Sequence, residues 1–487
     1  MARLPRNIRA LADQALSRTA GAPLVGGNAV RLLQDARENY PAWEAAIREA
    51  KHTIHLEMYI IHRDRVGRRF VDLLAAKARE GVTVRVIYDW FGCGTGPMRG
   101  LFRPLLLAGG QVRVFNPPSI AAMFGWIRRN HRKLLVVDGE VAFIGGLCIG
   151  DAWEGQPERG RAPWRDTAVE IRGPAAAHAD AAFADSWEYT GGTLQDGEMA
   201  RWRDDELTKW RDGASEAPVA LRVIPTEPFT ASMLRVDLFV AAMARERLWI
   251  TDAYFMGHGP FADALMQAAR DGVDVRLLLP HGSDVGWTVP VSRTLYRSLL
   301  DAGVTVYEWT GSMIHAKTAV ADSRWSRVGS TNLNVNSWLG NWELDVLIED
   351  PTVAAAMEAQ FLEDLSRATA ITREPSGRLI ATPVRGVGGR TRRSARRVAR
   401  EVTGVARSLG AAVTGSRPLE DFEVGPLMLL SAAFVITAVL AWLRPAVIAW
   451  PIAALTTWAG ITLLIDAWQA HRAATRRSAT PSSREEP

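Results

Sequence analysis

The feature that most constrains how this 487-residue chain can fold is a motif that occurs twice. Each copy contains His-x-Lys with an Asp seven positions after the His, and the two copies are His131, Lys133 and Asp138, and His315, Lys317 and Asp322. A glycine-containing turn follows each copy at the same distance, at Gly145–Gly146 and at Gly329–Ser330. Matched segments on this scale predict that a whole domain is duplicated.

The residues that follow each histidine have the alternating pattern of a β-strand. Residues two apart share one face of a strand, so His315 and Lys317 should project together, about 6–7 Å apart at the backbone. Asp322 stands an odd number of positions from His315, beside a predicted turn. From the residues alone we therefore interpret the His and Lys as chemical and the Asp as structural.

The duplication extends beyond the motif. Residues 81–85 match residues 272–276, and Arg165-Asp166 matches Trp342-Glu343. Predicted strands alternate with predicted helices, as in the strand–helix–strand run 53–89. This alternation predicts an α/β fold in which two pseudo-symmetric repeats each contribute a mixed sheet flanked by helices.

At these residues the sequence resembles the phospholipase D superfamily, whose signature is H-x-K-x4-D followed by a Gly/Ser-Asn turn. The resemblance covers roughly residues 25–365. The stretches around Tyr59, His131 and Trp338–Glu343 look most like bacterial cardiolipin synthases. The resemblance implies that all six residues of the two motifs, both aspartates included, belong to the catalytic set, and that His131 is the nucleophile.

Paired histidines suit the cleavage of a phosphodiester. A neutral imidazole can attack phosphorus while a second, protonated imidazole donates to the departing alkoxide. Lys133 and Lys317 would neutralise the non-bridging oxygens, and Asn332 could donate to the same oxygens, so that neither a metal ion nor another cofactor is required. The expected intermediate is a phosphohistidine, which water or another alcohol then releases.

A carboxylate follows each motif about thirty residues later. We predict that Asp166 orients His131 and that Glu343 orients His315, each by accepting the second ring N–H of its histidine. Cys148 stands where the family has an asparagine, and because a thiol is a weak donor, the first repeat should lack one contact to phosphate.

An apolar segment, Ala121–Ile127, precedes the first motif and ends at Arg128-Arg129. It is either core packing or a lip where acyl chains enter beside basic residues that bind the head group. The two cysteines form neither a disulfide framework nor a zinc cluster. A formal net charge of +5 selects no partner by itself.

The C-terminal part changes character. Val424–Leu443 and Ala446–Ile465 are uncharged and long enough to cross a bilayer, and only two residues separate them. They predict a transmembrane hairpin with both chain ends in the cytoplasm, although a buried helical pair is the alternative. The predicted segments are an N-terminal arm (1–24), repeat 1 (25–215), repeat 2 (216–371), an Arg-rich juxtamembrane linker (372–422), the hairpin (423–466) and a polar tail (467–487).

These features predict a phosphatidyltransferase of the bacterial inner membrane, with cytoplasmic catalytic domains, that makes cardiolipin by transesterification between phospholipids. The expected substrates are anionic phospholipids, phosphatidylglycerol above all. A phospholipase D that releases phosphatidic acid would use the same residues. A nuclease is a further alternative because the basic linker could bind nucleic acid, but the hairpin argues against nucleic acid as a partner. A non-enzymatic membrane scaffold would not need two intact motifs.

Overall fold

The structure is a computed structural model that describes residues 14–94, 98–117, 128–194, 219–257, 259–374 and 379–384, together with residue 457. All but residue 457 belong to the first of two compact units, residues 1–399. The segment Ala121–Ile127 and, except for residue 457, the predicted hairpin lie outside the described residues. Within the described ranges, no helix combines the length and the apolar character that a membrane crossing needs.

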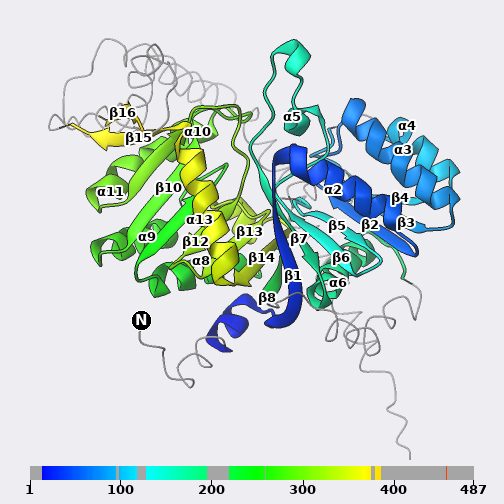
Figure 1. Cartoon of the computed structure of the whole chain (residues 1–487), viewed down its shortest axis with the longest axis horizontal. Helices are drawn as coiled ribbons and strands as arrows, with labels where there is room; N and C mark the ends of the chain where they lie inside the picture. The colour runs from blue at the N-terminus through cyan, green and yellow to red at the C-terminus, as the bar shows by residue number, and fades with distance from the viewer. Residues whose placement is uncertain are drawn as a thin grey trace, which may run out of the picture. The chain divides into compact units, whose positions relative to one another are not determined.

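Among the described residues, sixteen strands form one continuous mixed sheet (Figure 1). The first half has the order β1-β7-β6-β5-β2-β3-β4, and the second half repeats it as β8-β14-β13-β12-β9-β10-β11, followed by β15 and β16. The halves meet where β1 pairs with β8. The predicted duplicated α/β fold is thereby confirmed.

The strands of the first half run through the part of the chain before residue 173. They are β1 (Val25–Gln34), β2 (Thr53–Met58), β3 (Thr83–Asp89), β4 (Gln111–Phe115), β5 (Lys133–Val137), β6 (Val141–Gly145) and β7 (Thr167–Arg172). The second half contains β8 (Val219–Thr226), β9 (Arg247–Thr251), β10 (Asp274–Pro280), β11 (Thr305–Trp309), β12 (Thr318–Ala321), β13 (Trp325–Gly329), β14 (Glu343–Glu349), β15 (Ala368–Arg373) and β16 (Leu379–Pro383).

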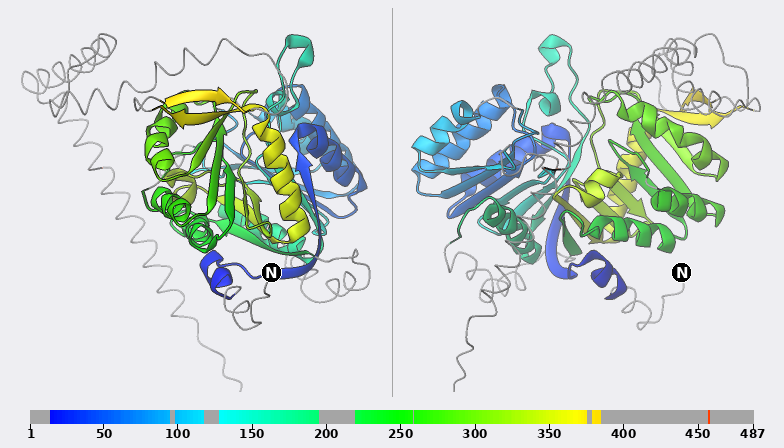
Figure 2. Two further views of the ribbon diagram at one scale, coloured as in Figure 1. Left: turned by 60° about the vertical axis from the view of Figure 1, so that its left-hand side comes forward. Right: turned by 180° about the vertical axis from the view of Figure 1, so that it is seen from behind.

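The helices cover both halves of the sheet, as Figure 2 shows from two further sides. Those of the first half are α2 (Asp35–Glu49), α3 (Arg65–Arg79), α4 (Arg99–Leu107), the short α5 (Asp151–Glu154), the 3₁₀ turn η2 (Pro157–Arg159) and α6 (Pro174–Tyr189). Those of the second half are α8 (Ser232–Met243), α9 (Gly259–Arg270), α10 (Thr288–Thr294), α11 (Tyr296–Asp301), α12 (Val335–Leu339) and α13 (Pro351–Leu365).

Local sequence explains where these helices begin. The Asp64 side chain accepts from the backbone N–H of Gly67 and caps α3, and Asp350 does the same for α13 through the N–H groups of Thr352 and Val353. An N-cap of this kind satisfies donors that have no partner within the helix. The capped helices then bury one apolar face, as α3 does with Phe70.

A central hydrophobic core is shared by the two halves. It joins Phe183 and Trp187 of α6 to strand residues of both repeats, and it includes Met357 and Phe361 of α13. Helix α6 packs on β8 of the second half, and α13 packs on β1 of the first half. Because each half contributes to this core, burial of apolar surface holds the ends of β5 and β12 next to each other.

Candidate active site

His131 and His315 lie immediately before β5 and β12, where the two halves of the sheet meet. The backbone N–H of His131 donates to the carbonyl oxygen of Trp342 (2.8 Å), and that of His315 donates to the carbonyl oxygen of Arg165 (2.7 Å). Each histidine is therefore bonded, through its own backbone, to the residue that precedes the carboxylate of the other repeat. This exchange brings both motifs to one site.

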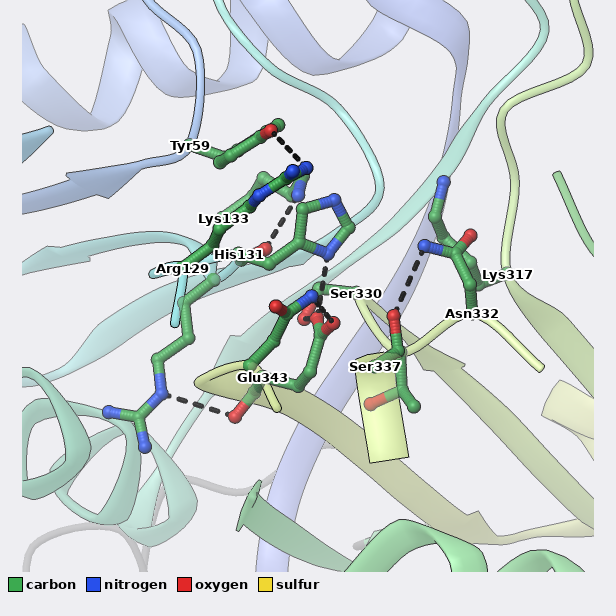
Figure 3. Close-up of polar contacts among 12 residues, drawn as sticks. Tyr59, Arg129, His131, Lys133, Lys317, Ser330, Asn332, Ser337 and Glu343 are labelled. Atoms are coloured by element: carbon green, nitrogen blue, oxygen red, sulfur yellow. Dashed lines mark hydrogen bonds and ion pairs between the residues drawn. The ribbon is translucent and has the colours of Figure 1, made fainter. Parts of the chain in front are cut away.

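The carboxylates pair with the histidines across the repeats. Nδ1 of His131 lies 2.8 Å from Oε2 of Glu343, and Nδ1 of His315 lies 2.8 Å from Oδ2 of Asp166 (Figure 3 shows the first pair). The prediction that each acid orients the histidine of its own repeat was wrong. Sequence spacing suggested pairs within a repeat, whereas the bridges Asn130–Trp342 and Arg165–Ile314 bring each acid to the opposite motif.

Both imidazoles are buried, and their surroundings favour the neutral form. Burial, with Lys133 and Lys317 nearby, lowers the pKa of His131 well below 6.5. Burial and the charge of Lys317 also lower the pKa of His315, although the Asp166 carboxylate opposes that effect. Burial raises the pKa of Glu343. For Asp166 the raising effect of burial is outweighed by His315 and Lys317, so its pKa lies below its ordinary value.

The two lysines lie beside the histidines on the same strand ends. Nζ of Lys133 donates to the carbonyl oxygen of His131 (2.5 Å), and Nζ of Lys317 donates to that of His315. Both ammonium groups are buried, and burial lowers the pKa of Lys317 to about 8. Two buried cations next to two imidazoles form a site for a group that carries negative charge on several oxygens.

The side chains that hold the two carboxylates differ between the halves. Oγ of Ser330 donates to Oε2 of Glu343 (2.6 Å), but Gly146 occupies the matched position in the first half. A Cβ at Gly146 would lie 2.1 Å from Oδ1 of Asp166, so the closeness of that carboxylate requires glycine. The site is thus asymmetric in its supporting groups.

Asn332 is buried close to Lys317 (Figure 3). Its Nδ2 has one long contact, 3.5 Å to Oγ of Ser337, and its Oδ1 finds no partner in the part of the chain that the structure describes. Cys148 takes the matched place in the first half and is fully buried. The phosphate contact predicted for Asn332 stays a prediction.

Comparison with known proteins fits this duplicated arrangement. The model of the family described as "Cardiolipin synthase, PLD-like domain" matches residues 44–152 and 240–365, which lie in the two halves of the sheet. A cardiolipin synthase A of Pseudomonas syringae is 34% identical over 374 residues, which cover 74% of this chain and 74% of that protein. A cardiolipin synthase of Clostridium perfringens is 31% identical over 350 residues, or 71% of this chain and 72% of that protein.

The chain belongs to the phospholipase D-like cardiolipin synthase family. A solved structure, the phosphatidylserine synthase of Haemophilus influenzae, has the same fold, with a TM-score of 0.55 over 74% of this chain and 91% of that one at 15% identity.

The two aspartates of this phospholipase D-like motif lie at the far ends of β5 and β12 from the histidines. Asp138 accepts from the backbone N–H groups of residues 51, 52 and 53 at 2.7–2.8 Å. Asp322 accepts in the same way from residues 245, 246 and 247 at 2.8–3.2 Å. Both aspartates thus fasten the starts of β2 and β9 to the neighbouring turn. This placement favours the structural interpretation, and a catalytic role for either aspartate stays a prediction.

Aromatic residues that we did not predict complete the phospholipase D-like site. The Tyr59 ring lies edge-on to His131 at 4.7 Å and under Nζ of Lys133 at 4.9 Å, and Tyr254 is placed in the same way in the other half. The available signal was the match between Glu57-Met-Tyr59 and Asp252-Ala-Tyr254. Trp153 donates Nε1–H to Oδ2 of Asp166 (3.2 Å), whereas its sequence counterpart in the second half, Trp338, donates to Asp237.

Proposed function

We propose that this chain is a membrane-bound enzyme that makes cardiolipin by transesterification between two phospholipids, through a phosphatidyl group carried on His131. Kinship with proteins named cardiolipin synthase makes it a phosphatidyltransferase of the phospholipase D superfamily. The observation that carries the proposal is the meeting of two buried imidazoles, each held by a carboxylate of the other repeat, beside two buried lysines.

The first half-reaction begins with a neutral His131. Its Nε2 attacks the phosphorus of phosphatidylglycerol, while Nδ1–H is held by Glu343. An N–P bond forms and the P–O bond to the head-group glycerol breaks. Protonated His315 gives its Nε2 proton to the departing alkoxide, so that free glycerol leaves. Lys133 and Lys317 stabilise the charge that develops on the non-bridging oxygens.

The second half-reaction reverses these roles. A hydroxyl of a second phosphatidylglycerol gives its proton to His315 and attacks the phosphorus. The N–P bond to His131 then breaks, and cardiolipin is released with both histidines returned to their starting protonation states. Attack by water in place of the lipid hydroxyl would give phosphatidic acid.

The electrostatic asymmetry supports this division of labour. A nucleophile must be neutral, and the pKa of His131 lies well below 6.5 because burial and the neighbouring lysines disfavour its cation. A general acid must hold a proton; burial and Lys317 lower the pKa of His315 too, but the ionised Asp166 opposes that lowering. The ion pair with Asp166 stabilises the imidazolium that the first half-reaction needs.

Membrane attachment through the hairpin at 423–466 is part of the proposal. Two uncharged runs of twenty residues support it, as do the arginines on both sides, which favour a cytoplasmic catalytic unit at a bacterial inner membrane. The Arg-rich linker would rest on anionic lipid. We also propose the six segments that the sequence predicts, from the N-terminal arm to the polar tail. Strand β16 lies inside the range of the predicted linker.

Expression of this chain in a bacterial host that lacks cardiolipin tests the proposed reaction. We expect cardiolipin to appear in the lipid extract, and we expect none with His131→Ala expressed at the same level. Phosphatidic acid without cardiolipin would identify a hydrolase. An unchanged lipid profile with the protein in the membrane fraction would contradict both reactions.

A further inference from the structure

Two exposed phenylalanines lie against consecutive arginines beside the catalytic site. The guanidinium of Arg129 lies 4.0 Å from the centre of the Phe91 ring, and that of Arg128 lies 5.3 Å from the centre of the Phe229 ring. The Phe229 residue is 73% exposed and Phe91 is 41% exposed. Phe91 comes from the first repeat and Phe229 from the second, so the four residues join the two halves.

The backbone holds Phe229 in an unfavourable conformation. Its φ is +68°, in the left-handed region that a bulky side chain rarely adopts. The N–H of Phe229 donates to the carbonyl oxygen of Leu339 (2.9 Å), which fixes the loop after β8. Strain of this kind persists where the surrounding structure imposes it, and it gathers at functional positions. Because the Phe229 ring is mostly exposed, its burial does not offset the cost of this backbone conformation.

Hydrogen bonds also fix Arg128 and Arg129, which directly precede Asn130 and His131 in the sequence. Nδ2 of Asn116 donates to the carbonyl oxygen of Arg128 (2.7 Å), and the backbone N–H of Trp342 donates to that of Arg129 (2.8 Å). Nη1 of Arg129 also donates to the hydroxyl oxygen of Tyr59 (3.3 Å), whose ring contacts His131 (Figure 3).

Strand register places both phenylalanines just outside the level of His131. Thr226, the last residue of β8, pairs with Glu343, and Phe229 follows three residues later. Asp89 ends β3 and accepts from the backbone N–H of Asn130 (2.8 Å), and Phe91 follows two residues later. Each ring therefore extends the wall of the site outwards, one from each half.

We propose that Phe91, Arg129, Arg128 and Phe229 form a rim that docks the mouth of the site on a bilayer of anionic phospholipid. This inference rests on the proposed function, because a lipid substrate has to leave the bilayer to reach His131. Aromatic rings enter the interface between head groups and acyl chains, and the guanidinium groups bind lipid phosphates at the same depth. Glu227 lies in the Phe229 loop and is the acidic residue there, while the buried Asp89 lies beside Arg129.

Kinetics of the full-length chain reconstituted in vesicles test the rim. Phe229→Ser should lower kcat/KM on long-chain phosphatidylglycerol vesicles by about tenfold or more, the loss expected when one Phe no longer enters an apolar phase. Turnover of dihexanoylphosphatidylglycerol below its critical micelle concentration should stay within about twofold, because a dissolved lipid needs no docking. Phe229→Leu should restore most of the vesicle activity.

A matched control is Leu107→Ala. Leu107 is 78% exposed, but it ends α4 shortly before the start of β4, whereas Asp89 and Phe115 lie at the opposite end of β3 and β4. It should leave both activities unchanged. In mixed phosphatidylcholine vesicles, Arg128→Gln should raise the mole fraction of phosphatidylglycerol needed for half-maximal rate by about fivefold, the worth of one basic residue at the surface.

Three outcomes would overturn the rim. In the first, Phe229→Ser loses equal activity on vesicles and on dissolved lipid at an unchanged melting temperature. In the second it loses activity on neither, and in the third Phe229 is needed for binding of a fluorescent single-stranded oligonucleotide while vesicle activity is intact. Wild-type protein inactive on both lipids would instead overturn the proposed function, and the rim would fall with it.

Discussion

His131 and His315 occupy matched positions but have different neighbours. His131 faces Glu343, whose pKa burial raises, while His315 faces Asp166, whose pKa lies below its ordinary value. Trp153 also lies edge-on to His315 at 5.7 Å, with no equivalent beside His131 among the described aromatic contacts. The two halves therefore share a fold but give their histidines different chemical environments.

Single substitutions of the histidines should separate their roles. We expect His315→Ala to attack a nitrophenyl phosphodiester, whose leaving group needs no proton, and to accumulate phosphohistidine. We expect His131→Ala to form no covalent intermediate with any substrate. Mass spectrometry after an alkaline quench, in which phosphohistidine survives, measures both results. A phosphoryl group on His315 in the His131→Ala variant would reverse the assignment.

The pH dependence should report Lys317. Its pKa is about 8 because burial disfavours the ammonium, so its charge, and with it kcat/KM, should fall as the pH rises through about 8. Between that value and 10.5 the unfolded chain binds more protons at this group, so its contribution to stability rises with pH. As the pH rises above about 8, we therefore expect activity to fall without a fall in the melting temperature. Lys317→Arg should move the alkaline limb upwards, and an unmoved limb would assign it to another group.

Trp153→Phe should separate positioning from packing. The substitution keeps a ring but removes the Nε1–H that donates to Asp166. Because a hydrogen bond to a charged group contributes about 1.5–3 kcal/mol, kcat should fall about tenfold with little change in KM. The control is Trp338→Phe, which removes a similar bond to Asp237 (2.9 Å). Equal loss of kcat in both variants would reduce the role of Trp153 to general stability.

At the scale of elements, the β5–β6 and β12–β13 turns do the same task in each half. Each turn carries an aspartate with a left-handed backbone, φ +51°, that binds three backbone N–H groups at the start of a neighbouring strand. His131 and His315 lie at the other end of β5 and β12, respectively. A shift of the turn would therefore displace the histidine at the other end of the strand.

Removal of Asp138 should act on stability first. Asp138→Ala leaves three N–H groups without their acceptor, and the free energy of unfolding in urea should fall by about 2 kcal/mol or more. Asp138→Asn keeps one acceptor oxygen and should lose less. At a temperature where the variant remains folded, kcat should change less than tenfold. A variant of full stability but without activity would return Asp138 to the catalytic set.

Sequence patterns predicted the elements well and the contacts between them poorly. The duplicated motif predicted two equivalent halves, because the spacing of hydrophobic residues and turns is local information. It could not assign Glu343 to His131, because either histidine is an equally good partner in sequence terms and only the bridges between the repeats decide. Trp153 was missed because its sequence counterpart, Trp338, bonds to Asp237 and not to a carboxylate of the site, so the repeated Trp-x-Gly does not by itself indicate a contact with Asp166.

At the scale of the whole molecule, the catalytic unit should fold without the C-terminal segments. A chain that ends after residue 384 keeps β15 and β16, which pair with each other at the edge of the sheet. We expect it to retain a cooperative melting transition but to be released from membranes by carbonate, while the full chain stays bound. Release of the full chain as well would contradict the proposed hairpin.

The crossed pairing of histidines and acids also bears on how such a chain could have arisen. One repeat alone holds a histidine without its acid and an acid without its histidine. A single-copy ancestor with this geometry would have had complete sites only where two identical chains met around a two-fold axis, so it would have had to associate before the copies were fused. A fused chain allows each copy to differ, as Gly146 and Ser330 do here.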